Sequence, residues 1–152
     1  MKAMTTLGLP GSGKSTWAKQ YVLDHPDTIR INNDEIRNAI YERLGHRNWS
    51  KEIENKVKAE RSAMILGCFL CGKNIIIDNT HCNKWAFEAI QKECGEIGYD
   101  VEIVDFTGVS ADECIRRDAL REGHERVGEE VIRRMEKQLA EITNPKPKKV
   151  LL

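Results

Sequence analysis

Residues 8–16 read GLPGSGKST, and this stretch decides the fold. It fits the pattern G-x-x-x-x-G-K-[ST], whose fixed positions here are Gly8, Gly13, Lys14 and Ser15. A short apolar segment precedes the stretch and a helix-forming segment follows it, which is the order of strand, loop and helix that the pattern requires. The stretch therefore predicts a phosphate-binding loop (P-loop). A plain glycine turn ahead of a helix is the alternative.

Each part of this loop suits the phosphates of a nucleotide. Glycines let successive backbone N–H groups point at one anion, and the positive end of the following helix adds to the attraction. We expect the Lys14 ammonium to reach the β- and γ-phosphates and the Ser15 hydroxyl to ligate Mg²⁺. Thr16 is assigned to the α-phosphate or to packing. The residues predicted to bind the nucleotide are Gly8, Pro10, Gly11, Ser12, Gly13, Lys14, Ser15 and Thr16.

The composition indicates an ordinary globular protein. Of its 152 residues, 40% are hydrophobic and 32% are charged, and the formal net charge is zero. We expect one domain over residues 1–152. Because the chain has no overall basic field, long-range attraction alone cannot hold a nucleic acid. Any polymeric substrate must therefore be gripped locally.

The five cysteines, an odd number, occur in a sequence with no signal peptide and no apolar run long enough to span a bilayer. We therefore expect free thiols, a cytoplasmic location and no membrane partner. Cys68 and Cys71 have the spacing of half a zinc site, and the His-Cys pair at 81–82 could supply the other half. Packing is the preferred interpretation, because both thiols lie in an apolar run, 63–71, that is typical of a buried helix.

Apolar periodicity and capping residues predict an alternation of strands and helices. Such an alternation implies an α/β fold with a parallel sheet and helices on both faces, which is the P-loop NTPase architecture. The isoleucine run at 75–77 indicates the central strand. The basic end of the chain, 143–152, is expected to fray. The expected strands are 4–7, 28–32, 74–78 and 101–106, and the expected helices are 14–24, 34–44, 51–71, 83–97, 110–121 and 129–142.

Acidic side chains follow two of the predicted strands, at the edge where such sheets bind ligands. Asp78 ends the isoleucine strand, where P-loop proteins place the carboxylate that holds Mg²⁺ or its water; a cap for the turn at 79–80 is the alternative. Asp34 begins the next helix after the second strand, and Arg37 lies on the same helical face one turn later. Asp34 could accept a hydroxyl proton while Arg37 grips a neighbouring phosphate. Alternatively, the two are a helix cap and a solvated arginine.

Three arginines, Arg117, Arg121 and Arg126, lead from a helix into a segment bounded by glycines. This arrangement suits a short lid that brings positive charge onto a transferring phosphoryl group. An ordinary salt-bridged face is the alternative, because residues 112–141 hold nine acidic and seven basic residues.

Four segments, in this order and spacing, resemble the kinase domain of the phage-type 5′-hydroxyl polynucleotide kinases, which belong to the adenylate-kinase-like P-loop phosphotransferases. They cover nearly all of residues 1–142. Bifunctional members also carry a 3′-phosphatase domain, so only the kinase half is implied. Residues 81–84 depart from the Asn and Pro that are more usual after the strand-end aspartate. The four segments are GLPGSGKSTWAKQYV (8–22), INNDEIRNAI (31–40), IIIDNTHCNKWAFEAI (75–90) and CIRRDALREG (114–123).

The resemblance implies transfer of the γ-phosphate of ATP to the 5′-hydroxyl end of DNA or RNA, with Mg²⁺ as the metal. The P-loop residues keep the roles given above. Asp34 matches the general base, and Arg37 matches the residue that holds the phosphate next to the acceptor hydroxyl. Arg121 matches the lid arginine that stabilises the transition state, with Arg117 as a second candidate.

Other functions also fit the sequence. A kinase for a small-molecule hydroxyl, such as that of a nucleoside, is the alternative enzyme, because a neutral chain does not require a polymer. A nucleotide-binding module without catalysis is a third hypothesis. The stretch 37–61 holds seven basic and four acidic residues and could line an acceptor channel. His46, Arg47 and Trp49 could add a platform for a terminal base, although packing of Trp49 at the start of the long helix is preferred.

Overall fold

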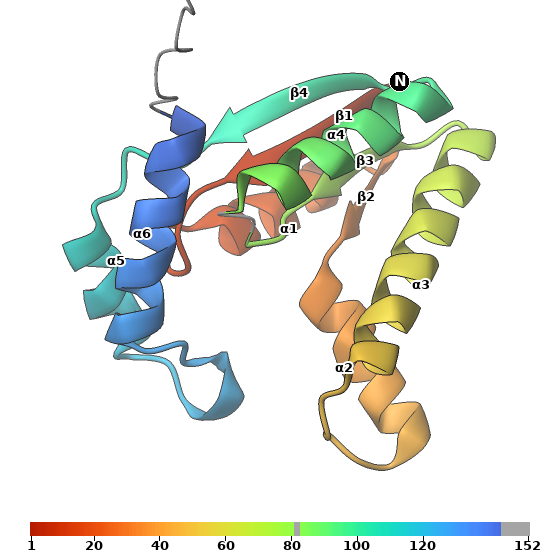
Figure 1. The fold of residues 1–152 in the computed structure, drawn as a ribbon. Helices are drawn as coiled ribbons and strands as arrows, with labels where there is room; N and C mark the ends of the chain where they lie inside the picture. The colour runs from red at the N-terminus through yellow and green to blue at the C-terminus, as the bar shows by residue number, and fades with distance from the viewer. Residues whose placement is uncertain (81–82, 144–152) are drawn as a thin grey trace, which may run out of the picture.

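The computed structural model describes residues 1–80 and 83–143. In these segments four parallel strands form one sheet in the order β2-β3-β1-β4, with helices around it (Figure 1). The α/β class and the parallel sheet predicted from the sequence are confirmed. The strands are β1 (Lys2–Leu7), β2 (Thr28–Ile31), β3 (Asn74–Ile77) and β4 (Asp100–Asp105). The helices are α1 (Lys14–Asp24), α2 (Asn33–Leu44), α3 (Lys51–Leu70), α4 (Lys84–Ile97), α5 (Ala111–Asp118), the 3₁₀ helix η1 (Gly123–Glu125) and α6 (Glu129–Thr143).

Two apolar layers follow from the alternation of side chains along the strands. In the pairing of β1 with β3, Ala3 lies opposite Ile75 and Met4 lies opposite Ile76. Because successive strand residues point to opposite faces, each pair belongs to a different layer. Ala3 and Ile75 pack with α2, α3 and α4, whereas Met4 and Ile76 pack with α1. Helices therefore cover both faces of the sheet, as predicted.

A third apolar cluster lies beyond the carboxyl end of β1. It joins α4, α5 and α6 to the start of the P-loop, because Leu9 of the loop is one of its buried members. The cluster thus holds the α5–α6 pair beside the loop. Its buried members are Leu7, Leu9, Phe87, Ala111, Cys114, Ile132 and Leu139.

Side-chain caps set the start of four helices. Asn32, Ser50, Asn83 and Ser110 each accept a hydrogen bond from the backbone N–H three residues later. The observed elements lie close to the predicted ranges, and Ser110 is the predicted cap. The largest difference is at the end of α5, which stops at residue 118 instead of 121.

The prediction of a buried helix over 63–71 is wrong. Ile65 and Cys68 are buried, but Leu66 and Leu70 are 47% and 75% exposed. Residues three and four apart share a helical face, so one face of α3 packs on the sheet and the other is an apolar surface. None of the described helices, α3 included, is long and apolar enough to cross a membrane.

Four of the five cysteines lie in the described segments, and all four are free thiols. Cys68 packs in the core while Cys71 is exposed, so the two do not share one environment. Burial raises the pKa of Cys94 to about 11, which keeps that thiol protonated. The His-Cys pair at 81–82 lies outside the described residues.

The two faces of α3 predict a contrast between neighbouring substitutions. We expect Ile65→Ala to lower the free energy of unfolding by about 2–5 kcal/mol, because it leaves a cavity beneath the helix. Leu66→Ala is the matched control and should change it by no more than about 0.5 kcal/mol. Urea denaturation followed by circular dichroism measures both. Equal losses of unfolding free energy in the two variants would contradict the placement of Leu66 on an exposed face of α3.

Candidate active site

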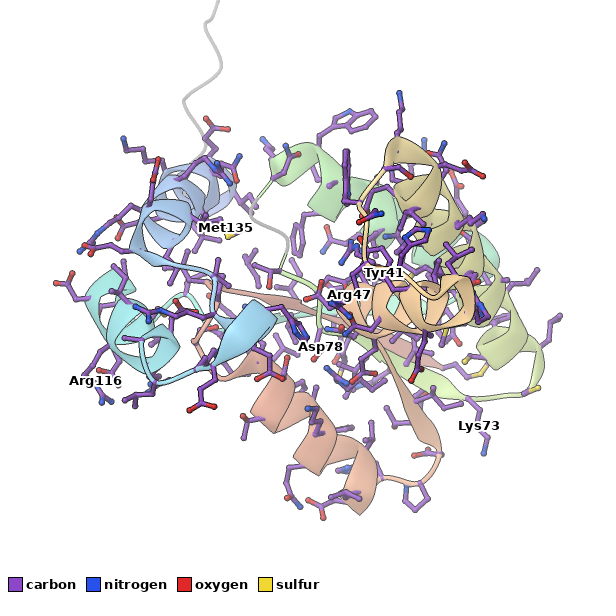
Figure 2. The ribbon with its side chains drawn as sticks, turned by 90° about the horizontal axis from the view of Figure 1, so that it is seen from below. Tyr41, Arg47, Lys73, Asp78, Arg116 and Met135 are labelled. Atoms are coloured by element: carbon purple, nitrogen blue, oxygen red, sulfur yellow. The ribbon has the colours of Figure 1, made fainter. Side chains whose placement is uncertain are left out.

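The carboxyl edge of the sheet opens into a cavity of about 870 Å³. Three strand ends lead to it: the P-loop follows β1, α2 follows β2, and Asp78 follows β3. The start of α1 and the segment between α5 and α6 complete its wall. Figure 2 shows Asp78 between α1, α2 and η1. Parallel pairing therefore assembles the predicted site residues at one edge.

The P-loop has a backbone that glycine adopts readily. Gly11 and Gly13 have φ angles of 86° and 98°. A Cβ atom on Gly11 would lie 2.8 Å from the carbonyl oxygen of Cys114, so glycine is also required for the close approach of α5. Gly8 and Ser12 are buried and do not line the cavity. The predicted phosphate-binding residues that line the cavity are Pro10, Gly11, Gly13, Lys14, Ser15 and Thr16.

Lys14 is buried inside this loop. Its Nζ donates to the carbonyl oxygens of Gly8 and Leu9, each at 2.7 Å, and lies 3.5 Å from Ser12 Oγ. The ammonium is thus fixed at the wall of the cavity by the loop itself. An anion that enters the loop meets a positive charge that is already in place.

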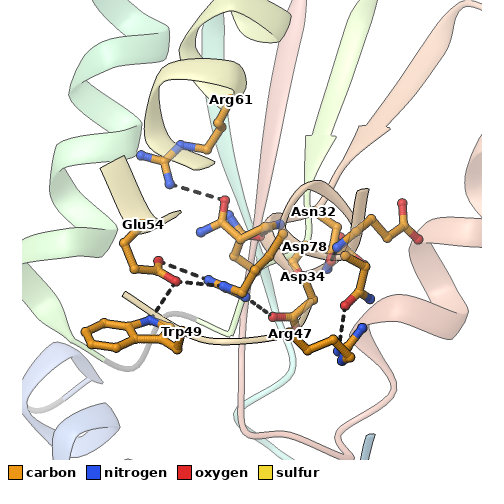
Figure 3. A network of polar contacts seen from close by, with 12 residues as sticks. Asn32, Asp34, Arg47, Trp49, Glu54, Arg61 and Asp78 are labelled. Carbon is orange, nitrogen blue, oxygen red and sulfur yellow. Dashed lines mark hydrogen bonds and ion pairs between the residues drawn. The ribbon is translucent and has the colours of Figure 1, made fainter. Parts of the chain in front are cut away.

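Asp34 and Arg37 line the cavity from the first two turns of α2. Figure 3 shows Asp34 and Glu54 in the network of polar contacts at this wall. Arg37 Nη1 donates to Asp34 Oδ1 at 2.6 Å. The cap of α2 is Asn32, whose Oδ1 accepts the N–H of Glu35 at 3.0 Å. Asp34 is therefore not the helix cap. Its side chain is 78% exposed, so the carboxylate is accessible to a ligand.

Glu54 of α3 orients Arg37 through two parallel hydrogen bonds. Arg37 Nε donates to Glu54 Oε1 at 2.7 Å and Nη2 donates to Oε2 at 3.1 Å. The hydrogen bond from Arg37 lowers the pKa of Glu54, and the one to Glu54 raises the pKa of Arg37. Both groups are therefore charged at neutral pH. The sequence did not single out Glu54, because only the packing of α2 on α3 brings it to Arg37.

Trp49 does not pack in the way that was preferred from the sequence. It is 67% exposed, and its Nε1 donates to Glu54 Oε1 at 3.0 Å. His46 and Arg47 instead line a hollow that adjoins the cavity. The three residues suggested as a platform are therefore not together. His46 and Arg47 line the hollow, whereas the indole of Trp49 binds the carboxylate that holds Arg37.

Asp78 is tied to the end of β2. Its Oδ2 accepts from Arg30 Nε at 2.8 Å, and its Oδ1 accepts from Asn32 Nδ2 at 3.1 Å. The carboxylate is 1% exposed, and Arg30 also contacts Glu35. Asp78 thus joins two neighbouring strands at the cavity. The sequence missed Arg30, whose only signal is a basic residue within the alternating strand 28–31.

The lid segment brings one of its three predicted arginines to the cavity wall. Arg121 lines the cavity, with Nη1 3.8 Å from Asp118 Oδ1. Arg126 is exposed and lies away from that wall. Only Arg121 is therefore positioned by the lid to face the P-loop cavity.

Arg117 lies against the outside of the P-loop. Its Nη1 donates to the carbonyl oxygen of Gly11 at 3.1 Å, and its Nε donates to Glu113 Oε1 at 2.8 Å. Glu113 also accepts two hydrogen bonds from Arg116. The alternative of a salt-bridged face therefore holds for this part of α5, while Arg117 links that face to the loop.

Asp118 anchors the far end of the lid and was missed by the sequence. Its carboxylate is 2% exposed and accepts the backbone N–H groups of Val127 at 2.9 Å and Gly128 at 2.8 Å. Burial raises its pKa, but these two hydrogen bonds and the charges of Arg121 and Arg126 outweigh burial, so the pKa is lowered. The ionised carboxylate clamps the return of the chain onto α5.

A P-loop between a buried strand and its helix, on a parallel sheet, places the chain in the class of P-loop proteins with an α/β fold. The profile of one protein family, described as AAA domain, matches residues 4–142. The chain belongs to this family.

Several solved structures share the fold. A chain in the Pnkp1/Rnl/Hen1 RNA repair complex is 22% identical, with a TM-score of 0.81, and the match covers 96% of this chain and 46% of that one. A sugar kinase from Janibacter sp. HTCC2649 is 17% identical, with a TM-score of 0.62 and coverage of 97% and 81%. The APS kinase CysC of Mycobacterium tuberculosis, in complex with AMPPNP and APS, is 21% identical, with a TM-score of 0.54 and coverage of 78% and 69%. The chain thus spans less than half the length of the first, and at these identities the likeness establishes the fold.

The clamp at Asp118 predicts a pH-dependent contribution to stability. Because the pKa is lowered in the folded state, the stabilisation is complete above the unfolded value of about 3.9 and is lost as the pH falls through the folded value. Asp118→Asn should cost about 1–3 kcal/mol at neutral pH, since one amide oxygen cannot serve both N–H donors equally. The variant should also lack this acid-dependent loss. Urea unfolding at a series of pH values measures both effects.

Asp112→Asn is the control for this experiment. Asp112 is exposed on the same helix and pairs with Arg133 at the surface, so its substitution should be nearly neutral. Amide hydrogen exchange of Val127 and Gly128 should accelerate only in the Asp118 variant. Unchanged exchange there would contradict the clamp.

Proposed function

We propose that the chain transfers the γ-phosphate of ATP to the 5′-hydroxyl end of a DNA or RNA strand. The observation that carries this proposal is the pair of Asp34 and Arg37 on the wall of the P-loop cavity. The carboxylate suits the proton of an acceptor hydroxyl, and the guanidinium suits a phosphate beside it. A strand end offers both groups, the 5′-hydroxyl and the phosphate on the 3′ side of the same nucleotide. The RNA repair complex that shares the fold supports this acceptor class.

In the proposed reaction, Asp34 accepts the proton of the 5′-hydroxyl while that oxygen bonds to the γ-phosphorus. The bond from the γ-phosphorus to the β–γ bridging oxygen breaks, and ADP leaves. Arg37 holds the adjacent phosphate, and its two hydrogen bonds to Glu54 fix its direction. Because binding has already fixed the position of the acceptor, the entropy cost of orienting it no longer adds to the activation barrier.

The donor side of the proposed reaction uses the loop and the lid. The P-loop N–H groups and the Lys14 ammonium bind the β- and γ-phosphates. Arg121 adds positive charge from the lid as charge develops on the transferring group. Arg117 acts on the same phosphates only indirectly. Its hydrogen bond to the Gly11 carbonyl holds the loop that binds them.

The residues at this edge fit Mg²⁺ held partly through water. Ser15 offers its hydroxyl from the first turn of α1. Both oxygens of Asp78 already accept from Arg30 and Asn32, which suits a bond to metal-bound water better than direct ligation. Mg²⁺ typically keeps several of its waters in proteins. Bound here, the ion would supply charge neutralisation for the phosphates.

A kinase for a small-molecule hydroxyl is the second candidate function. The observation that favours it is the match to the sugar kinase, which covers 81% of that chain and 97% of this one. Asp34 would be the base in this case too, but the grip of Arg37 on a phosphate would have no role for an alcohol that lacks one.

Substitution of Asp34 separates catalysis from plain nucleotide binding. Asp34→Asn should lower kcat by about 10²–10⁴-fold, because the amide cannot accept the hydroxyl proton. Transfer of labelled γ-phosphate to a 5′-hydroxyl oligonucleotide measures this loss, and circular dichroism checks the fold. Glu52→Gln, at an exposed position of α3, is the control and should retain full activity. Equal rates in wild type and Asp34→Asn would contradict the assigned base.

A panel of acceptors tests the role of Arg37. The panel contains 5′-hydroxyl DNA, 5′-hydroxyl RNA, nucleoside 3′-monophosphates and nucleosides. Arg37→Ala should lower kcat/KM by about 10- to 100-fold for acceptors with a 3′-side phosphate, and much less for nucleosides. If the wild type transfers phosphate only to nucleosides, the proposal is wrong and the small-molecule kinase is supported.

A further inference from the structure

A second hollow, of about 630 Å³, continues the active-site cavity along α2. Asn38, Tyr41 and Arg47 line both spaces, so the two form one groove. Asp34, Asn38 and Tyr41 share one face of α2, because they follow one another at spacings of four and three residues. The groove therefore begins at the proposed base and runs toward the carboxyl end of α2.

Arg47 lies over the ring of Tyr41 in this groove (Figure 2). Its Cζ is 5.2 Å from the ring centroid, and its Nη2 donates to Asn38 Oδ1 at 3.0 Å. Both partners are neutral. Within residues 1–80 and 83–143, no carboxylate lies within ion-pair distance of Arg47, whereas Arg37 is paired with two carboxylates and Arg43 with one.

An arginine that is positioned by neutral groups and has no carboxylate partner is suited to bind a phosphate. Contact with the ring and the hydrogen bond to Asn38 restrain the guanidinium, and Asn38 takes one N–H donor and leaves the others for a ligand. Glu35, which also lines the hollow, is already paired with Arg30. Glu42 lines the hollow too, but its carboxylate does not lie within ion-pair distance of Arg47.

The spacing of residues along α2 places Arg47 at a distance from Arg37, the residue proposed to hold the phosphate next to the acceptor hydroxyl. Arg37 and Tyr41 are one helical turn apart, about 6 Å along the axis. This distance is comparable to the spacing of adjacent phosphates in an extended strand. His124 of η1 lines the same hollow from the lid side and offers a ring on which a base can stack.

We infer that Arg47, held over the ring of Tyr41, binds the second phosphate of a single-stranded acceptor. This inference rests on the proposed polynucleotide kinase activity and defines its substrate class as unpaired strand ends longer than one nucleotide. Arg37 holds the phosphate after the first nucleotide, and Arg47 holds the phosphate after the second. The smallest acceptor that reaches both is a dinucleotide with a 3′-phosphate, 5′-HO-NpNp.

Acceptor length tests this subsite. We expect wild-type kcat/KM to be about 10- to 100-fold higher for 5′-HO-NpNp than for 5′-HO-Np, as for a hydrogen bond to a charged group. Arg47→Ala should remove most of this preference, chiefly through KM on the longer acceptor. Arg43→Ala is the matched control, because Arg43 is an exposed arginine of α2 that is paired with Glu60 and lies outside both hollows. It should retain the preference.

Equilibrium binding provides a second readout that does not depend on turnover. Calorimetry with a 5′-deoxy analogue of NpNp, which has no hydroxyl to accept phosphate, should show the same fold-loss of affinity in Arg47→Ala. Arg47 is exposed, so its removal leaves the core intact, and thermal melts verify this.

The outcomes separate the inference from the function on which it rests. If the wild type uses both acceptors equally, or if Arg47→Ala loses the same factor on both, the subsite is refuted and the proposed function stands. If the wild type phosphorylates neither acceptor, the proposed function itself is wrong, and the inference falls with it.

Discussion

Parallel pairing of β1 with its neighbours β3 and β4 is the constraint on which the site depends. Because the strands run the same way, their carboxyl ends meet at one edge, where the P-loop, α2 and Asp78 converge. The ends of β2 and β3 are also joined by polar contacts, since Asp78 binds Arg30 and Asn32. A buried carboxylate of this kind requires its partners, because loss of one leaves an uncompensated charge. The edge of the sheet is thus held together by the same groups that line the cavity.

The cavity has two walls of different construction. On one side, α2 carries Asp34 and Arg37, and Glu54 of α3 holds Arg37 from behind, in a charged network of hydrogen bonds. On the other side, the segment between α5 and α6 carries Arg121 and is fixed mainly through Asp118. In the proposed reaction the first wall holds the acceptor and the second covers the donor.

The sequence was sufficient wherever a local pattern carries the information. The P-loop follows from its own nine residues, and the pair of Asp34 and Arg37 follows from helical spacing. The partners that orient these groups could not be predicted, because Glu54 reaches Arg37 only after α3 packs on α2. The same applies to Arg30 at Asp78. The buried helix was mispredicted because α3 carries apolar residues on both faces, and hydrophobicity alone does not reveal which face meets the sheet.

The short helix α5 contacts both the P-loop and the lid segment. Its Cys114 carbonyl lies so close to Gly11 that no side chain fits between them, and Arg117 adds a hydrogen bond to the same glycine. Asp118, the last residue of α5, holds the returning lid. One helix of eight residues therefore joins the P-loop to the segment between α5 and α6, so the relative position of these two parts of the cavity wall depends on α5.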